Sequence, residues 1–145
     1  MSLQTQHQHL GGLSWEQPSD LSSKPNQERL SPAAIAGFLE IARLWKVRDE
    51  DARILLGGIS NGAFYALKRR PKKTLDQDQL TRISLLVGIF KALNILFSRK
   101  LADAWVRLPN QNPMFAGSTP LSYMLQGGVP AMIRVRQLLD ARRGG

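Results

Sequence analysis

Apolar residues recur at the three- and four-residue spacing of helices along most of the chain, and no stretch alternates apolar and polar residues as a strand would. The longest periodic stretch, residues 76–98, is apolar around almost its whole circumference. A helix of this kind is buried on several sides, so we expect it to be the central helix of the fold and part of an oligomer interface. Gly88 within it would let another helix approach closely. The pattern predicts an all-α fold.

Three shorter helices are predicted before the central one. The first begins at Pro32, with Ser31 as its cap, and has one apolar face. The second covers residues 49–56, opens on three acidic side chains that suit the positive end of the helix dipole, and stops at two glycines. The third covers residues 61–70 and is capped by Ser60. Only a short turn separates the second helix from the third.

Three more helices are predicted after the central one. Residues 99–108 form a short helix that a proline ends. Thr119 caps a helix over residues 120–126, two glycines end that helix, and Pro130 opens the terminal one. The apolar face of the 99–108 helix consists of Leu101, Ala104, Trp105 and Leu108. That of the terminal helix consists of Met132, Ile133, Val135, Leu138 and Leu139.

The composition narrows the class of protein. The chain has 145 residues, enough for one domain with a hydrophobic core. It contains no cysteine, which excludes disulfides, thiolate metal sites and a cysteine nucleophile. Lys and Arg number 20 against 11 acidic residues, a net charge of +9. Such an excess indicates a polyanionic partner or an acidic protein surface, the alternative being a charge that serves only solubility.

The first part of the chain is polar. Residues 1–30 are rich in Gln, Ser, Gly, Pro and His, so we expect them to be largely disordered. They carry no secretory leader, and His7 and His9 lack the neighbouring ligands of a metal site. The most apolar window of the chain, residues 83–97, is shorter than the roughly 20 residues of a membrane span. We therefore expect a cytoplasmic protein that does not enter a membrane.

The second and third helices, with the glycine turn between them, have the outline of a helix-turn-helix module. Ile59, Phe64 and Leu67 would pack inward. Residues 68–73 contain five cations and no acid, which favours phosphate contacts over the alternative of a solvated loop. The residues that we assign to DNA are Ser60, Asn61, Tyr65, Lys68 and Arg69 at the groove, with Arg70, Lys72 and Lys73 near the phosphates.

No catalytic constellation is present in the sequence. Both histidines lie in the polar N-terminal segment, so a serine or threonine hydrolase would lack its usual base, and no pair of carboxylates lies among apolar residues. The glycine pairs at 57–58 and 127–128 lack the Lys-Ser/Thr of a phosphate-binding loop. We therefore predict no enzyme activity, no catalytic residue, no bound metal and no cofactor.

The C-terminal segment, residues 112–145, combines an Asn-Pro, a turn of small residues, a Thr-Pro-Leu helix broken by Gly, and a final apolar helix with a basic end. The residues that carry this pattern are Asn112, Gly117, Thr119, Pro120, Leu121, Leu125, Gly127, Val135, Leu138 and Leu139. The ordered set resembles the toxin-binding region of the Xre/MbcA/ParS antitoxins, with Ala116 where these families usually have Gly. The helix-turn-helix resembles the Xre module more loosely, because Gly57-Gly58 adds a residue to the turn.

This resemblance implies a bacterial antitoxin of a type II toxin-antitoxin pair, with a RES-domain toxin as its partner. It also implies that the toxin consumes NAD or uses it to modify a target, and that the antitoxin obstructs the NAD site. Residues 76–145 would bind the toxin and form a homodimer or higher oligomer, and residues 31–75 would bind the antitoxin's own operator. Interface cores favour aromatic residues, Met and Arg. We expect toxin contacts from Thr119, Tyr123, Met124, Arg134, Arg136, Arg142 and Arg143.

Two other functions remain open. A stand-alone dimeric transcription regulator would use the C-terminal helices only to dimerise. A non-specific nucleic-acid binder would use the +9 charge, show little sequence preference and lose affinity steeply with salt. A toxin gene next to this one, or a second polypeptide that copurifies, would favour the antitoxin.

Overall fold

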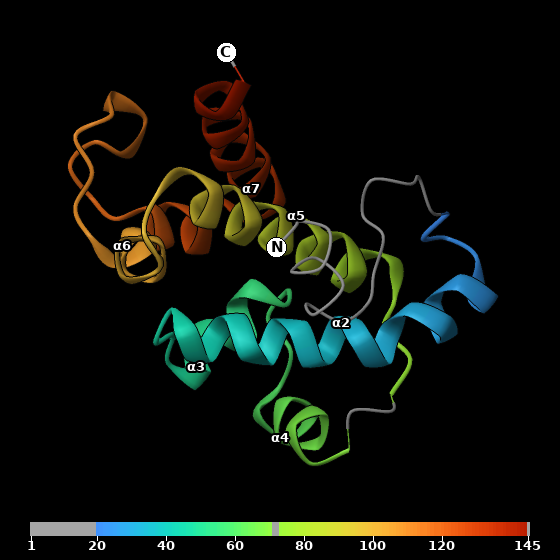
Figure 1. The fold of residues 1–145 in the computed structure, drawn as a ribbon. Helices are drawn as coiled ribbons and strands as arrows, with labels where there is room; N and C mark the ends of the chain where they lie inside the picture. The colour runs from blue at the N-terminus through green and yellow to red at the C-terminus, as the bar shows by residue number, and fades with distance from the viewer. Residues whose placement is uncertain (1–19, 71–72, 145) are drawn as a thin grey trace.

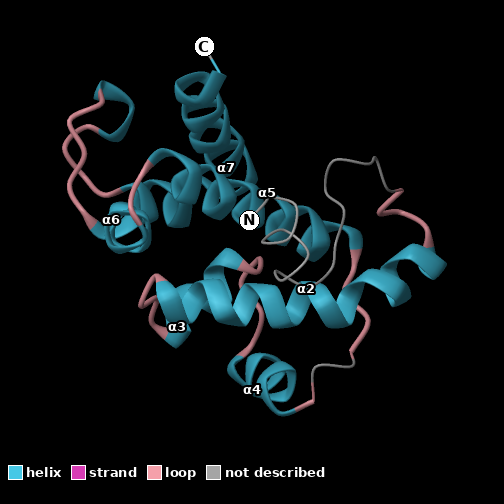
Figure 2. Ribbon diagram, viewed as in Figure 1, coloured by secondary structure: helices cyan, strands magenta, loops and turns pink. Residues whose placement is uncertain are grey.

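The computed structural model describes residues 20–70 and 73–144, and within these ranges the chain consists of helices and loops with no strand (Figure 2). α5 (Gln77–Leu96) crosses the middle of the molecule (Figure 1). It packs against α2 (Lys24–Leu44) on one side and against α7 (Pro120–Gly144) on the other. The prediction of an all-α fold is confirmed.

Three short α-helices and two 3-10 helices complete the fold of the described residues. α3 (Asp49–Leu55) and α4 (Asn61–Arg69) follow α2, and α4 lies on the side of α2 away from α5 (Figure 1). α6 (Arg99–Ala104) packs against α5 and continues into the 3-10 helix η1 (Trp105–Arg107). A second 3-10 helix, η2 (Pro113–Phe115), precedes α7. The positions of α3, α4 and α5 agree with the helices that the apolar pattern predicts.

The N-terminal helix is longer than predicted. α2 begins at Lys24, where the Ser23 side chain accepts a hydrogen bond from a backbone N–H of the first turn. The expected start at Pro32 is therefore wrong, and this proline lies inside the helix. Leu30 is 4% exposed and Ser31 is 0% exposed. Their burial holds the helix together through a position where proline normally ends one.

Part of the polar N-terminal segment is consequently ordered. Residues 20–23 form a turn, and residues 24–30 form the first two turns of α2. The prediction of disorder over residues 1–30 is wrong for residues 20–30. It followed from local composition, which does not include the tertiary contacts that stabilise the helix. Residues 1–19, with both histidines, lie outside the described residues.

Ser31 joins α2 to the start of α5 instead of capping a helix. Its hydroxyl donates to the carbonyl of Gln27 (2.5 Å) and accepts from the backbone N–H of Leu75 (2.7 Å). Asp76 then caps α5 by accepting from the N–H of Gln79 (2.8 Å), while the Gln79 side chain accepts from the N–H of Asp76 (3.1 Å). The start of the central helix is thus fixed both locally and to α2.

α5 is the core helix, as predicted. Its buried residues are Leu80, Ile83, Leu86, Val87, Gly88, Ile89, Lys91, Ala92 and Leu93. With 20 residues, α5 has the length and composition that could span a membrane, but half of its most apolar window is buried inside the fold. Packing against α2 and α7 buries part of the apolar surface of this helix, and its expected role in an oligomer interface stays a prediction.

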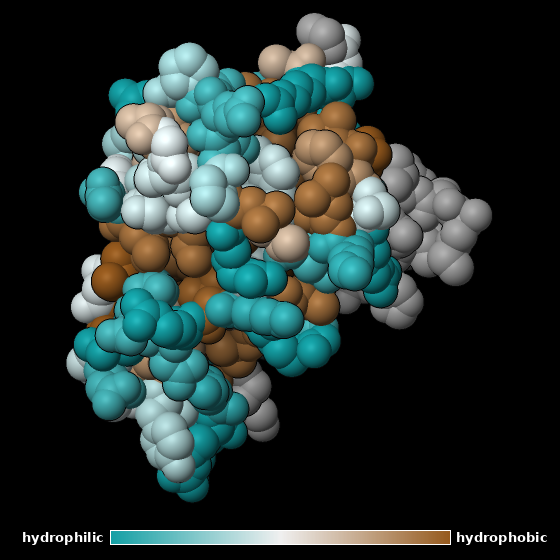
Figure 3. Space-filling view, turned by 90° about the vertical axis from the view of Figure 1, so that its left-hand side faces the viewer, coloured by the Kyte–Doolittle hydropathy of each residue, from teal (hydrophilic) through white to brown (hydrophobic). Residues whose placement is uncertain are grey.

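The apolar face predicted for residues 99–108 is only partly correct. α6 ends at Ala104 and the chain tightens into η1, which buries Trp105. Leu101 and Leu108 are 41% and 45% exposed. Leu108 follows the end of η1 with an extended backbone (φ −98°, ψ 140°) and so leaves the face that a continuous α-helix would give it, whereas Leu101 is exposed within α6 itself, where Ala102 is buried. Figure 3 shows hydrophobic side chains gathered in a band on this side of the molecule.

α7 consists of two helical segments that meet at Gly128. This residue has φ 64° and ψ −147°, a conformation that residues with a side chain rarely adopt. A Cβ added to the preceding Gly127 would lie 2.6 Å from the Cβ of Ala131. Figure 1 shows the two segments of α7 at a steep angle. The predicted break at the glycine pair is confirmed.

Candidate nucleic-acid and partner interfaces

The turn between α3 and α4 is fixed by its backbone and by one arginine. Gly57 and Gly58 have φ values of 98° and 82°, which favour glycine. The N–H of Gly58 donates to the carbonyl of Arg53 (2.8 Å), and Arg53 Nε donates to the carbonyl of Ile59 (2.9 Å). Ser60 caps α4 by accepting a hydrogen bond from a backbone N–H of its first turn (3.1 Å). Two helices joined by a short, well-bonded turn match the predicted helix-turn-helix outline.

α4 has an apolar inner face and a polar outer face. Phe64 and Leu67 are each 3% exposed, and Ile59 is partly buried against the core, as predicted. Tyr65 is 60% exposed. The predicted DNA contacts of this helix and its cap are all exposed: Ser60, Asn61, Tyr65, Lys68 and Arg69. They therefore lie where a nucleic acid could reach them, and their contacts with DNA stay predictions.

Lys68 differs from its exposed neighbours on α4. Its Nζ lies 3.3 Å from Oδ2 of Asp49 at the start of α3, and 5.4 Å from the centroid of the Phe64 ring. The Lys68 side chain is 45% exposed and that of Asp49 is 68% exposed, so the pair contributes little stability. In this ion pair the Lys68 side chain nevertheless lies toward α3. The sequence suggested only a helix-dipole role for Asp49, because the two residues are 19 positions apart.

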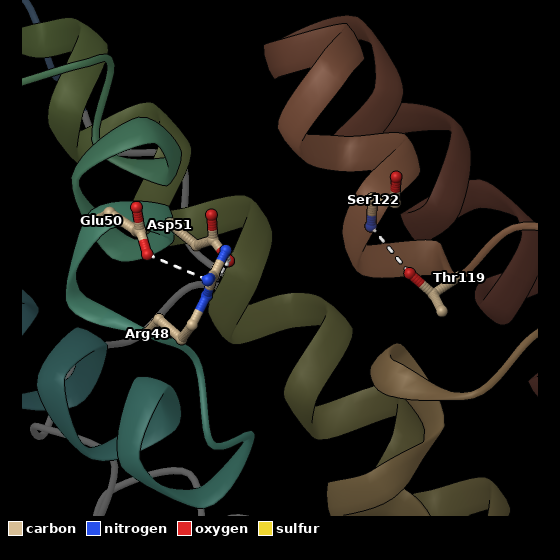
Figure 4. Close-up of polar contacts among 5 residues, drawn as sticks. All are labelled: Arg48, Glu50, Asp51, Thr119 and Ser122. Atoms are coloured by element: carbon tan, nitrogen blue, oxygen red, sulfur yellow. Dashed lines mark hydrogen bonds and ion pairs between the residues drawn. The ribbon is translucent and has the colours of Figure 1, made fainter.

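The start of α3 carries two more carboxylates. Arg48 pairs with Glu50 (3.0 Å) and with Asp51 (3.4 Å), as Figure 4 shows. The surface at the start of α3 therefore carries carboxylates as well as cations. Because carboxylates repel DNA phosphates, we expect DNA to approach the outer face of α4. Across residues 20–70 and 73–144, no group of three or more His, Cys, Asp or Glu side chains is placed to hold a metal ion.

The cations at the end of α4 have different surroundings. The guanidinium carbon of Arg69 lies 5.5 Å from the centroid of the Tyr65 ring. Arg70 follows the last helical residue, and both Arg70 and Lys73 are exposed. Lys72 lies outside the described residues. Phosphate contacts by Arg70 and Lys73 would need no rearrangement of the helix.

The second candidate surface lies on both segments of α7. Thr119 Oγ1 accepts from the N–H of Ser122 (3.0 Å) and caps the first segment (Figure 4). The ring of Tyr123 packs edge-on against Phe115, with centroids 5.3 Å apart. Arg134 follows the kink, and its Nη1 donates to the hydroxyl of Tyr123 at 3.4 Å. The bend thus brings two predicted toxin contacts from different segments together.

Three further arginines lie on the second segment of α7. Arg136 pairs with Asp140 (3.0 Å), and its guanidinium lies so close to Gly88 of α5 that an added Cβ would overlap it. Gly88 therefore makes room for an arginine side chain. Arg143 Nη1 lies 3.6 Å from the carboxylate of Asp140, and Arg142 is exposed. Arg136 is consequently part of the contact between α5 and α7 as well as a candidate toxin contact.

Met124 is 1% exposed and lies in the core, so the predicted surface role of its side chain needs correction. It supports the first segment of α7 from beneath. On the second segment, Met132, Val135 and Leu139 are fully buried, but Ile133 is 40% exposed. Sequence reasoning placed Ile133 on the apolar face and missed it as a surface residue. Met132, Val135 and Leu139 follow one another at helical spacing, and Ile133 lies off this stripe, so it faces the surface.

Ala116, in the loop before α7, has a left-handed backbone (φ 49°, ψ 39°). This conformation costs a residue with a Cβ about 1 kcal/mol. We expect Ala116→Gly to raise the free energy of unfolding by about 0.5 to 1 kcal/mol, measured by urea unfolding followed by circular dichroism. The control is Ala36→Gly at an exposed position inside α2, which should lower the free energy of unfolding by about 1 kcal/mol. A loss of stability at both positions would contradict the left-handed backbone.

Comparisons with known proteins match both halves of the chain. The family model for the antitoxin Xre-like helix-turn-helix domain matches residues 24–88, and the model for the antitoxin Xre/MbcA/ParS C-terminal toxin-binding domain matches residues 92–145. The uncharacterized protein y4oB of Sinorhizobium fredii (strain NBRC 101917 / NGR234) is 40% identical over 125 residues, which are 86% of this chain and 95% of that protein. No solved structure matches the chain. The two matched regions meet within α5.

Proposed function

The chain belongs to the Xre/MbcA/ParS family of antitoxins, and on this basis we propose that it neutralises a RES-domain toxin by binding it and blocking its NAD site. We further propose that it binds the operator of its own operon and acts in the cytoplasm. The two matched domains support an antitoxin with a helix-turn-helix for DNA. The RES class of the toxin and its use of NAD are our proposal.

The arginines of α7 carry the toxin half of the proposal. Residues 92–145 contain seven basic residues against two acidic ones, a net charge of +5. Tyr123 and Arg134 meet at the kink, and Arg142 is exposed near the chain end. Aromatic and Arg side chains dominate the binding energy of many interfaces. This surface suits a toxin with acidic groups around the mouth of its active site.

We propose a homodimer or higher oligomer as the binding unit. Ile54, Leu101 and Leu108 are 41–45% exposed, although they are large and apolar. Figure 3 shows the hydrophobic band on the face that α3 and α6 present. Exposed hydrophobic patches of this kind commonly mark protein interfaces. A dimer would also present two copies of α4 to a symmetric operator.

The toxin proposal is tested by co-expression with the product of the neighbouring gene, with growth and intracellular NAD as readouts. We expect the natural chain to restore both. The triple variant Arg134→Ala/Arg142→Ala/Arg143→Ala should bind the toxin at least about a hundredfold more weakly and fail to restore either, because it loses the cations that face the partner. The matched control, Arg99→Ala/Lys100→Ala/Arg107→Ala, removes three exposed cations from the same half of the chain and should retain neutralisation.

Each part of the proposal can fail separately. Equal loss of binding in both triple variants would show that charge alone, not the α7 surface, drives association. Growth arrest without loss of NAD would contradict a toxin that consumes NAD but still fit one that modifies a protein. A natural chain that binds its operator but no neighbouring gene product would instead be a stand-alone regulator.

A further inference from the structure

We propose that α4 reads DNA sequence with two side chains, Asn61 and Arg69, that Tyr65 between them positions Arg69, and that Lys68 reads no base. This inference rests on the proposal that α3 and α4 bind the operator. Each of these residues of α4 then has a different task, and the bases that Asn61 and Arg69 read follow from their chemistry.

The three residues form a continuous strip. Asn61, Tyr65 and Arg69 are spaced four residues apart, so they follow one another along the outer surface of α4. All three are exposed, while Phe64 and Leu67 on the opposite face are buried. The strip is therefore the part of α4 that would enter a groove if DNA approaches the exposed face.

The side chains beside the strip are small. Gly62 and Ala66 lie on the outer half of the helix, and both are exposed. A Cβ added to Gly62 would meet no atom within 4 Å, so the space in front of the helix backbone is open. This allows the helix to come close to base edges. It also leaves Asn61 and Arg69 as the groups on the outer face with the hydrogen-bonding chemistry for bidentate readout.

The chemistry of the two end residues predicts which bases they read. An Asn side chain pairs bidentately with the N6 and N7 atoms of adenine, and an Arg guanidinium pairs with O6 and N7 of guanine. Asn61 and Arg69 are eight residues apart, which is about 12 Å along the helix axis. These two residues would read separate base pairs, and the angle of α4 to the DNA axis sets the number of base pairs between them. Each half-site should therefore contain one adenine and one guanine at a constant spacing.

The two cations of α4, Arg69 and Lys68, lie against different neighbours. The Arg69 guanidinium carbon lies 5.5 Å from the Tyr65 ring centroid, so the ring restricts the arginine to the outer face. Lys68 Nζ lies toward α3, 3.3 Å from Oδ2 of Asp49 and 5.4 Å from the centroid of the Phe64 ring. Its charge therefore lies beside α3, and we assign it to the phosphates and not to a base.

The test is selection of bound duplexes from a pool of double-stranded DNA with a randomised 20-base-pair segment, using the full chain and its variants. The natural chain should select an adenine and a guanine at a constant spacing. Asn61→Ala should lose only the adenine preference, and Arg69→Ala only the guanine preference, each by about ten- to a hundredfold. Tyr65→Ala should weaken the guanine preference, whereas Tyr65→Phe should keep it. Lys68→Ala should weaken binding to all sequences equally.

The outcomes separate this inference from the proposed function. A natural chain that selects no sequence contradicts operator binding itself. A selected sequence that Asn61→Ala and Arg69→Ala leave unchanged overturns the base assignments, and an unchanged guanine preference in Tyr65→Ala overturns the positioning role. A base preference that changes in Lys68→Ala overturns the exclusion of Lys68. Because the four side chains are exposed, the variants should fold, and their melting temperatures check this.

Discussion

Replacing Leu93 with alanine should lower the free energy of unfolding by about 3 kcal/mol and the melting temperature by about 10 °C. Leu93 is 0% exposed in α5, the helix that packs against both α2 and α7. The substitution leaves a cavity that the surrounding side chains fill only in part. Because α5 joins the two matched regions, we expect DNA binding and toxin neutralisation to weaken together as the temperature approaches the new melting point.

Leu101→Ala is the matched control for this experiment. It removes the same atoms from a side chain that is 41% exposed, so it should cost about 1 kcal/mol or less. Thermal unfolding by circular dichroism measures both variants. Equal losses of stability in Leu93→Ala and Leu101→Ala would contradict the central position of α5. A loss of toxin binding in Leu101→Ala at full stability would instead place the hydrophobic band in the toxin interface.

The second large effect is expected at the kink of α7. Gly128→Ala puts a Cβ on a backbone at φ 64° and ψ −147°, which costs about 1 to 3 kcal/mol if the kink is kept. If the residue becomes helical instead, the second segment turns away and Arg134 leaves Tyr123. In the second case we expect toxin affinity to fall by at least about a hundredfold, whereas a kept kink lowers only the free energy of unfolding. The α3–α4 unit contains no part of this kink, so operator binding should persist.

The control for the kink is Gly144→Ala, where an added Cβ meets no atom within 4 Å. This variant should keep both stability and neutralisation. The measurements are thermal unfolding, binding to operator DNA and co-expression with the toxin. If Gly128→Ala neutralises the toxin as well as the natural chain does and also keeps its melting temperature, which indicates a relaxed kink, the angle between the two segments of α7 plays no part in recognition.

The sequence predicted the candidate sites only in part. The polar outer face of α4 follows from helical periodicity, because it needs only the spacing of Phe64 and Leu67. The pairing of Lys68 with Asp49 does not, since the fold has to bring α3 beside α4. The burial of Met124 could not be predicted from the sequence either, because a Met on a short helix suits a core and an interface equally well.

The sequence by itself determined the features that depend only on residues within one helical turn of each other. The caps at Ser60 and Thr119, the turn at Gly57-Gly58 and the break at Gly128 are of this kind. Each rests on a hydrogen bond to a nearby N–H or on the backbone freedom of glycine, which the identity of the local residues decides.

Only the tertiary structure decided where α2 begins and which charged groups meet. Ser31 is bonded to Leu75 across 44 positions, and this burial carries α2 through a proline that the local pattern treats as a start. Arg136 lies over Gly88 because α7 folds back onto α5. Such contacts depend on how distant segments pack, and packing free energy outweighs the local preference of any single residue.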